Sequence, residues 1–209
     1  MTDDPHPINA SLERWIKNIY LIVLGLGFSF IIRDLVVRFE TPVVTVTTVV
    51  YFLALYYFLS YDWIAYSALI NEYPYEVAEH SDLFYQGRFY IDMTHLLFKT
   101  VLIFLPLRPY NRVTLAAIPG LFAAWHATVV VWHEFGRREY PDGYDVPSRS
   151  HALMVFPFVG LSGGVWFLFA RFPGQYTALV LVLVLSSVIL YYTTFRKRTI
   201  IRKLGTGSE

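Results

Sequence analysis

Six long apolar stretches constrain this chain more than any other feature of its sequence. They cover residues 15–39, 43–70, 84–107, 111–135, 152–171 and 175–195. A helix of about 20 mainly apolar residues crosses the roughly 30 Å of hydrocarbon in a bilayer, and there it satisfies its own backbone hydrogen bonds. The stretches therefore predict an all-α fold, a polytopic integral membrane bundle of about six transmembrane helices.

The segments outside these stretches are short, so we expect one membrane domain with two tails. Residues 1–10 offer little to bury and predict a flexible N-terminal tail, and residues 11–195 form the transmembrane helical domain. Residues 196–209 form a basic C-terminal tail. Basic residues favour the cytoplasmic side, so this tail, with Arg14 and Lys17 near the other end, predicts cytoplasmic termini in the cell membrane.

Composition supports a membrane location and excludes several classes of function. The chain is 56% hydrophobic and only 16% charged, a balance that is rare in a water-soluble domain of this size. Its net charge of +1 and scattered basic residues argue against nucleic acid as a partner. It has no cysteine, which excludes disulfides, iron–sulfur clusters and thiolate metal sites.

The third stretch carries a row of polar residues, which we call the polar seam: Arg88, Asp92, His95 and Lys99. Their spacing of four, three and four residues places them on one face of a helix. An ionisable side chain at the centre of a bilayer costs on the order of 3 kcal/mol, so such groups usually face protein or water. The seam is therefore expected to point into the bundle.

Neighbouring stretches contain further ionisable residues at comparable depths: Arg33, Asp34, Asp62 and His126. Counting from the connecting loops places Asp62 level with Asp92 in an antiparallel pair of helices. Asp34 lies nearer the level of Lys99, so that an ion pair between the two is feasible. His126 lies at about the depth of Asp62. These residues predict a transport site or polar seam shared by several helices.

The charges allow more than one interpretation. They could line a hydrated path or proton relay, they could be ion pairs that fix the helix register, or they could form a catalytic or sensing site. Our leading hypothesis is a small channel or transport component, with Asp62, Asp92, His95 and Lys99 central. The first alternative is a non-catalytic membrane subunit or sensor that docks a cytoplasmic partner through residues 136–150 and the basic tail.

A second alternative is an intramembrane enzyme or a histidine-ligated redox protein. His126 and His133 are seven residues apart and share a helical face, and with His95 and His151 they could in principle bind haem or a metal. No spacing among them is diagnostic, so we assign neither cofactor nor metal and favour a protein that is not an enzyme. The expected partners are the lipid bilayer, further copies of the chain and a cytoplasmic protein.

Overall fold

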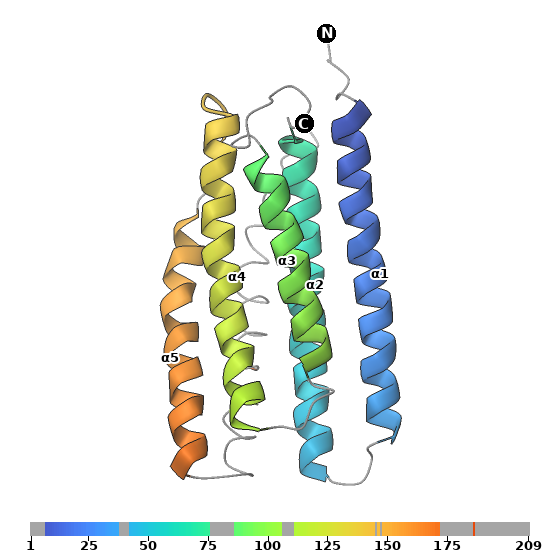
Figure 1. Ribbon diagram of the computed structural model, residues 1–209, viewed down its shortest axis with the longest axis vertical. Coiled ribbons are helices and arrows are strands. Elements are labelled where there is room, and N and C mark those ends of the chain that lie inside the picture. Colours follow the sequence, from blue (N-terminus) through green and yellow to red (C-terminus); the bar gives the residue numbers. More distant parts are fainter. Residues whose placement is uncertain are drawn as a thin grey trace, which may run out of the picture.

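The computed structural model describes residues 7–37, 42–75, 86–105, 111–144, 146, 148–171 and 186. This part of the chain contains five helices and no strand, which confirms the all-α class. The helices are α1 (Pro7–Val37), α2 (Pro42–Glu72), α3 (Gly87–Phe104), α4 (Arg112–Glu139) and α5 (Arg149–Arg171). They run alternately up and down along one long axis (Figure 1).

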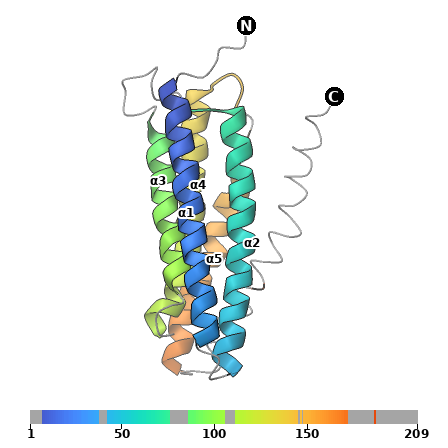
Figure 2. The ribbon, with the colours of Figure 1, turned by 90° about the vertical axis from the view of Figure 1, so that its right-hand side faces the viewer.

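Helix α3 has the most central position in the bundle. It packs against α1, α2 and α4, and α4 in turn makes the most extensive contact of the structure, with α5. Two views at right angles show α1 beside both α2 and α3, with α5 on the far side of α4 (Figures 1 and 2). The face of α3 that is turned inward is the one that carries the polar seam.

The core joins α2 to α4 through large aromatic side chains. Phe58 of α2 is fully buried and meets the rings of Phe122 and Trp125 edge-on, each at a centroid distance of 4.8 Å. Edge-to-face pairs of this kind stabilise a core beyond the effect of buried area. Phe158 of α5 stacks on Phe122 from the other side at 5.3 Å, so one aromatic stack links three helices.

Three helices of the described chain are long and apolar enough to cross a membrane, namely Val49–Glu72 within α2, α4 and α5. Helix α3 has only 18 residues and carries three charged side chains on them. The predicted number of six transmembrane helices is therefore not confirmed. The predicted span 175–195 lies outside the described residues except for residue 186.

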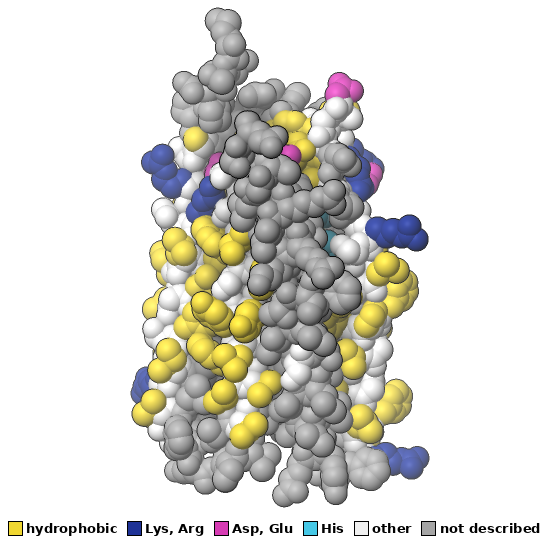
Figure 3. Space-filling view, turned by 180° about the vertical axis from the view of Figure 1, so that it is seen from behind, with side chains coloured by type: hydrophobic (Ala, Val, Ile, Leu, Met, Phe, Trp, Pro, Cys, Tyr) yellow, Lys and Arg dark blue, Asp and Glu magenta, His cyan; other side chains and the backbone are white. Residues whose placement is uncertain are grey.

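The outer surface agrees with membrane association. Large apolar side chains are exposed on several helices, including Val36 (69%), Leu97 (66%), Phe156 (76%) and Phe167 (72%). In the space-filling view, apolar side chains lie along both flanks of the visible face, whereas charged side chains lie mostly toward its ends (Figure 3). Exposed apolar surface of this extent marks contact with lipid or another protein.

Two helix beginnings follow from local sequence. Helix α1 begins at Pro7, because a proline needs no N–H partner in the first helical turn, and this is earlier than the predicted start at residue 15. Residues 7–10 of the predicted tail are therefore helical, and Asn9 is buried. Helix α4 is capped by Asn111, whose side chain accepts hydrogen bonds from the N–H groups of Val113 and Thr114.

The contact between α1 and α3 allows a matched test with two glycines of α1. A Cβ at Gly27 would clash with Cγ2 of Ile103, whereas a Cβ at Gly25 meets no described atom within 4 Å. We expect Gly27→Ala to lower the free energy of unfolding by about 1–3 kcal/mol through overpacking. Gly25→Ala should be neutral, or stabilising by up to about 1 kcal/mol through helix propensity. Unfolding by SDS in mixed micelles, followed by circular dichroism, measures both; equal effects would contradict this packing.

Candidate functional site

All four residues of the polar seam are buried inside the bundle. Their exposed fractions are 0% for Arg88, 5% for Asp92, 6% for His95 and 5% for Lys99. Each finds a different partner, on another helix or in a connecting loop. The seam is thus divided into a pair at the end of the bundle where α3 begins and a cluster deeper inside.

Arg88 and Glu139 form the pair at the end of the bundle. Nη1 of Arg88 lies 2.6 Å from Oε2 of Glu139, and the two side chains are 0% and 1% exposed. Nη2 donates a hydrogen bond of 2.8 Å to the carbonyl oxygen of Tyr73, and the guanidinium lies 4.5 Å from the ring centroid of Trp132. This buried ion pair ties the first turn of α3 to the last turn of α4.

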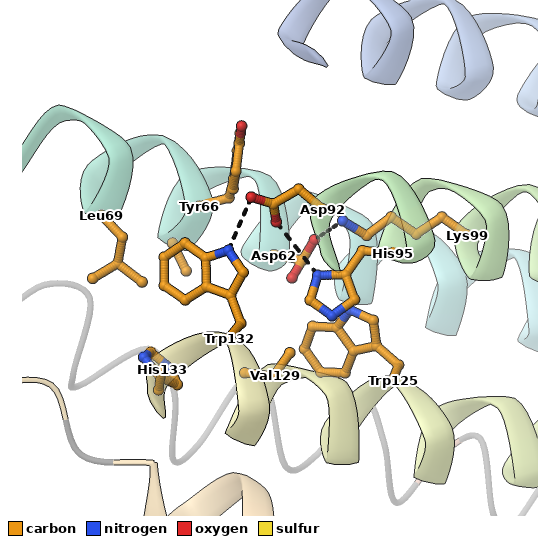
Figure 4. A pocket seen from close by; sticks show the side chains of 11 residues that line it. Asp62, Tyr66, Leu69, Asp92, His95, Lys99, Trp125, Val129, Trp132 and His133 are labelled. Atoms are coloured by element: carbon orange, nitrogen blue, oxygen red, sulfur yellow. Dashed lines mark hydrogen bonds and ion pairs between the residues drawn. The ribbon is translucent and has the colours of Figure 1, made fainter. Parts of the chain in front are cut away.

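Asp92 is the most heavily bonded member of the seam. Its Oδ2 accepts hydrogen bonds from the hydroxyl of Tyr75 and from Nε1 of Trp132, the latter at 2.9 Å. Its Oδ1 lies 3.5 Å from Nδ1 of His95 (Figure 4). Two donors therefore converge on Oδ2, whereas Oδ1 faces the imidazole of His95.

The hydrogen bonds of Asp92 continue into a chain of tyrosines. Burial, reinforced by the negative charge of Asp92, raises the pKa of Tyr75, so its phenol stays protonated. Because Tyr75 gives its one hydrogen to Asp92, the contact of 3.0 Å between the hydroxyls of Tyr66 and Tyr75 has Tyr66 as its donor. The chain therefore runs in one direction, from Tyr66 through Tyr75 to Asp92.

The bonding around His95 restricts where its protons sit. Its Nε2 lies 2.8 Å from the hydroxyl oxygen of Thr128, and that hydroxyl donates to the carbonyl oxygens of Trp125 (2.9 Å) and Ala124 (3.1 Å). When the hydroxyl donates its one hydrogen to a carbonyl, it accepts from His95, and Nε2 then carries the proton of the neutral ring. The other nitrogen faces Asp92. A second proton on the ring would therefore complete an ion pair between His95 and Asp92.

Lys99 pairs with Asp62 of α2, and both side chains are largely buried. The hydroxyl of Tyr20 on α1 lies 3.4 Å from Oδ2 of Asp62 and 3.0 Å from the carbonyl oxygen of Leu59. The ammonium of Lys99 also lies 4.4 Å from the ring centroid of Tyr20, a distance typical of a cation–π contact. Three helices therefore meet at this ion pair.

A small cavity lies beside the pair of Asp62 and Lys99 and the pair of Asp92 and His95. Its lining includes Asp62, Asp92, His95 and Lys99, with Trp125, Trp132 and His133 from α4 on the opposite side (Figure 4). The cavity has a volume of about 40 Å³. A buried water molecule needs about 10–15 Å³ on the same measure, so the cavity has room for a few waters. We call it the central cavity.

Several residues predicted for the site lie elsewhere. Arg33 is exposed, and the side chain of Asp34 lies outside the described part of the structure. Lys99 pairs with Asp62 rather than with Asp34. His126 is buried, but it faces α5, where its Nδ1 lies 3.0 Å from Nδ1 of His151. The predicted residues that meet at the central cavity are Asp62, Asp92, His95 and Lys99.

Sequence reasoning missed most of the partners of these residues. Tyr75 and Glu139 lie at the ends of the bundle, in or beside loops, and were not expected to reach the seam. Trp132 resembled one of many interfacial aromatic residues. The spacing of Trp125 and Trp132 could have indicated that both face the seam. They are seven residues apart, as are His126 and His133, so each pair shares a face of α4.

Within the described residues, no group of three or more His, Cys, Asp or Glu side chains is placed to hold a metal ion. The buried histidines instead form contacts with one another and with hydroxyl groups. Comparisons with known protein families, with curated proteins and with solved structures found no match to this chain.

The buried pair of Arg88 and Glu139 gives a testable difference from an exposed pair. Arg88→Met leaves Glu139 as an uncompensated buried charge, so we expect it to lower the free energy of unfolding by about 3–5 kcal/mol. Adding Glu139→Gln should recover most of this loss. Arg138 and Glu134, which are more than half exposed and 3.8 Å apart, provide the control, and Arg138→Met should cost less than about 1 kcal/mol. SDS-induced unfolding measures all three, and similar costs for the two single variants would contradict the assignment.

Proposed function

We propose that the protein is a small membrane transport component that binds and moves protons at the central cavity. One observation carries the proposal: the carboxylates of Asp62 and Asp92, the imidazole of His95 and the ammonium of Lys99 surround a cavity with room for water. Buried ionisable groups of this kind in a membrane helix mark ion pathways and proton relays.

The charge balance favours a proton as the ligand. Asp62 and Lys99 neutralise each other, so Asp92 supplies the remaining negative charge. One proton on Nδ1 of His95, which lies 3.5 Å from Asp92, brings the whole cluster to neutrality.

The hydrogen bonds offer a route for protons on one side of the cavity. Tyr75 follows α2 at the end of the bundle and connects through its hydroxyl to Asp92, which in turn faces His95. On the other side, Asp62 and Lys99 lie nearer the middle of the bundle, with Tyr20 alongside. Water in the cavity would join the two sides, since Asp92 and His95 line it on one side and Asp62 and Lys99 on the other.

We also propose that α1 and α3 cross the membrane and that the stretch 175–195 completes six spans. For α3, the argument is that its charged side chains are buried, whereas Tyr90, Leu97 and Val101 are exposed. Lipid would therefore meet an almost wholly apolar surface. The basic residues of the tail 196–209 and near the start of α1 support a cell-membrane protein with both termini in the cytoplasm.

A second candidate is a non-transporting membrane subunit or sensor. The pair of Arg88 and Glu139 favours it, because a fully buried ion pair between α3 and α4 fixes helix register. Such a bundle would dock a cytoplasmic partner through residues 136–150 and the basic tail, or assemble with further copies of itself. It would need no exchange of protons at the central cavity.

Proton flux into vesicles separates the two candidates. The purified protein is reconstituted in liposomes that contain a pH-sensitive dye, and a potassium gradient with valinomycin provides the driving force. We expect the unaltered protein to acidify the lumen and Asp92→Asn to slow this by roughly 100-fold, as for loss of a positioned proton-transfer group. Asp142→Asn, the same change at an exposed loop residue, should leave the flux unchanged.

The outcomes are distinct once circular dichroism shows that both variants are folded. Flux that falls in Asp92→Asn and persists in Asp142→Asn supports the transport proposal. If the unaltered protein carries neither protons nor other small cations, the transport proposal is wrong and the subunit candidate is favoured. Equal flux in all three proteins would lead to the same conclusion.

A further inference from the structure

A second cluster of titratable groups lies between α4 and α5, apart from the pairs around the central cavity. His126 and His151 are 0% and 2% exposed, and their Nδ1 atoms lie 3.0 Å apart. The rings have a centroid distance of 5.2 Å. This contact belongs to the most extensive helix pair of the structure, and neither residue lines the central cavity.

Two ring nitrogens at 3.0 Å form a hydrogen bond only if one carries a proton and the other does not. In the neutral pair, the donor ring is protonated at Nδ1 and unprotonated at Nε2, and the acceptor ring is protonated at Nε2. One extra proton adds to the unprotonated Nε2 of the donor ring. One hydrogen then remains between the two Nδ1 atoms, and the positive charge extends over both rings.

One of the two aromatic neighbours of His126 is placed to stabilise this singly charged state. The ring of Phe158 stacks on His126 at 5.3 Å, and the indole of Trp125 meets it edge-on at 4.8 Å. A stacked aromatic ring offers its negative face to an imidazolium. A second extra proton would set two N–H groups against each other, so the pair takes up one proton and resists the next.

We propose that His126 and His151 form a second proton-binding site, in which α4 and α5 hold one excess proton between them. This site does not depend on whether the central cavity transports protons. It differs from the pair of His95 and Asp92 because the acceptor is a second imidazole rather than a carboxylate.

The titratable and charged groups near the pair are His133, Tyr144 and Arg149. The ring of His133 on α4 lies 5.8 Å from that of His151, and its Nδ1 lies 2.7 Å from the hydroxyl of Tyr144 in the loop after α4. Burial raises the pKa of Tyr144, so this hydroxyl adds no charge. Arg149, two residues before His151, is exposed at the start of α5.

A proton fits the pair better than a metal ion. Transition metals bound by histidine require further ligands, and the described residues place no third His, Cys, Asp or Glu for this purpose. The buried position of both rings also leaves little access for water ligands. The spacing of the two nitrogens is that of an N–H···N hydrogen bond.

Nuclear magnetic resonance of the full chain in lipid nanodiscs, with ¹⁵N-labelled histidine, tests the proposal. We expect scalar coupling between the two Nδ1 atoms across the hydrogen bond, and a joint titration in which the two rings take up one proton. His126→Gln and His151→Gln should each abolish the coupling. His95→Gln, which removes another buried histidine on α3, should preserve it.

The coupling is read in the unaltered protein, so a variant that fails to fold does not decide the result. Two independent titrations without coupling would overturn the proposal. So would calorimetry in which the unaltered protein binds one equivalent of Zn²⁺ and neither His126→Gln nor His151→Gln does, since the pair would then be a metal site.

Discussion

The burial of charge along α3 is the constraint on which the arrangement of the bundle depends. Arg88, Asp92 and Lys99 lie on one apolar helix and are almost completely shielded from solvent. A buried charge without a partner costs several kcal/mol, so each must meet an opposite charge or several hydrogen-bond donors. The neighbouring helices are held where they supply these groups: α4 by Glu139 and Trp132, and α2 by Asp62.

This constraint also accounts for the place of α3 at the centre of the bundle. Its charged partners come from α2 and α4, and Tyr20 of α1 lies against Lys99, so the seam is satisfied where these three helices surround it. The aromatic stack around Phe58 and Trp125 then fills the remaining space between α2 and α4. Apolar packing supplies most of the contact, and the polar groups determine which faces meet.

The sequence predicted the helical class and the common face of the seam, because the period of an α-helix is enough for both. Counting residues from the connecting loops also placed Asp62 and Asp92 at one level, and both line the central cavity. It did not predict the partners. Whether Lys99 meets Asp34 or Asp62 depends on how each helix is rotated about its own axis, which residue spacing along a single helix does not determine. Tyr75 and Glu139 were missed because loops and helix ends fold back on the seam.

Ionisable residues differ in their access to water at different depths of this bundle. Arg88 and Glu139 form a buried pair, and moving a proton between them would leave two neutral groups in place of a strong ion pair. Asp92 and His95 line a cavity that has room for water, and Nε2 of His95 is hydrogen-bonded to the hydroxyl of Thr128. Under the proposed function, a proton that arrives at Nδ1 of His95 would leave the hydrogen bond between Nε2 and Thr128 in place. Under the proposed function, proton exchange would depend on access to the cavity and on the lone pair of the imidazole, rather than on the number of charges along the helix.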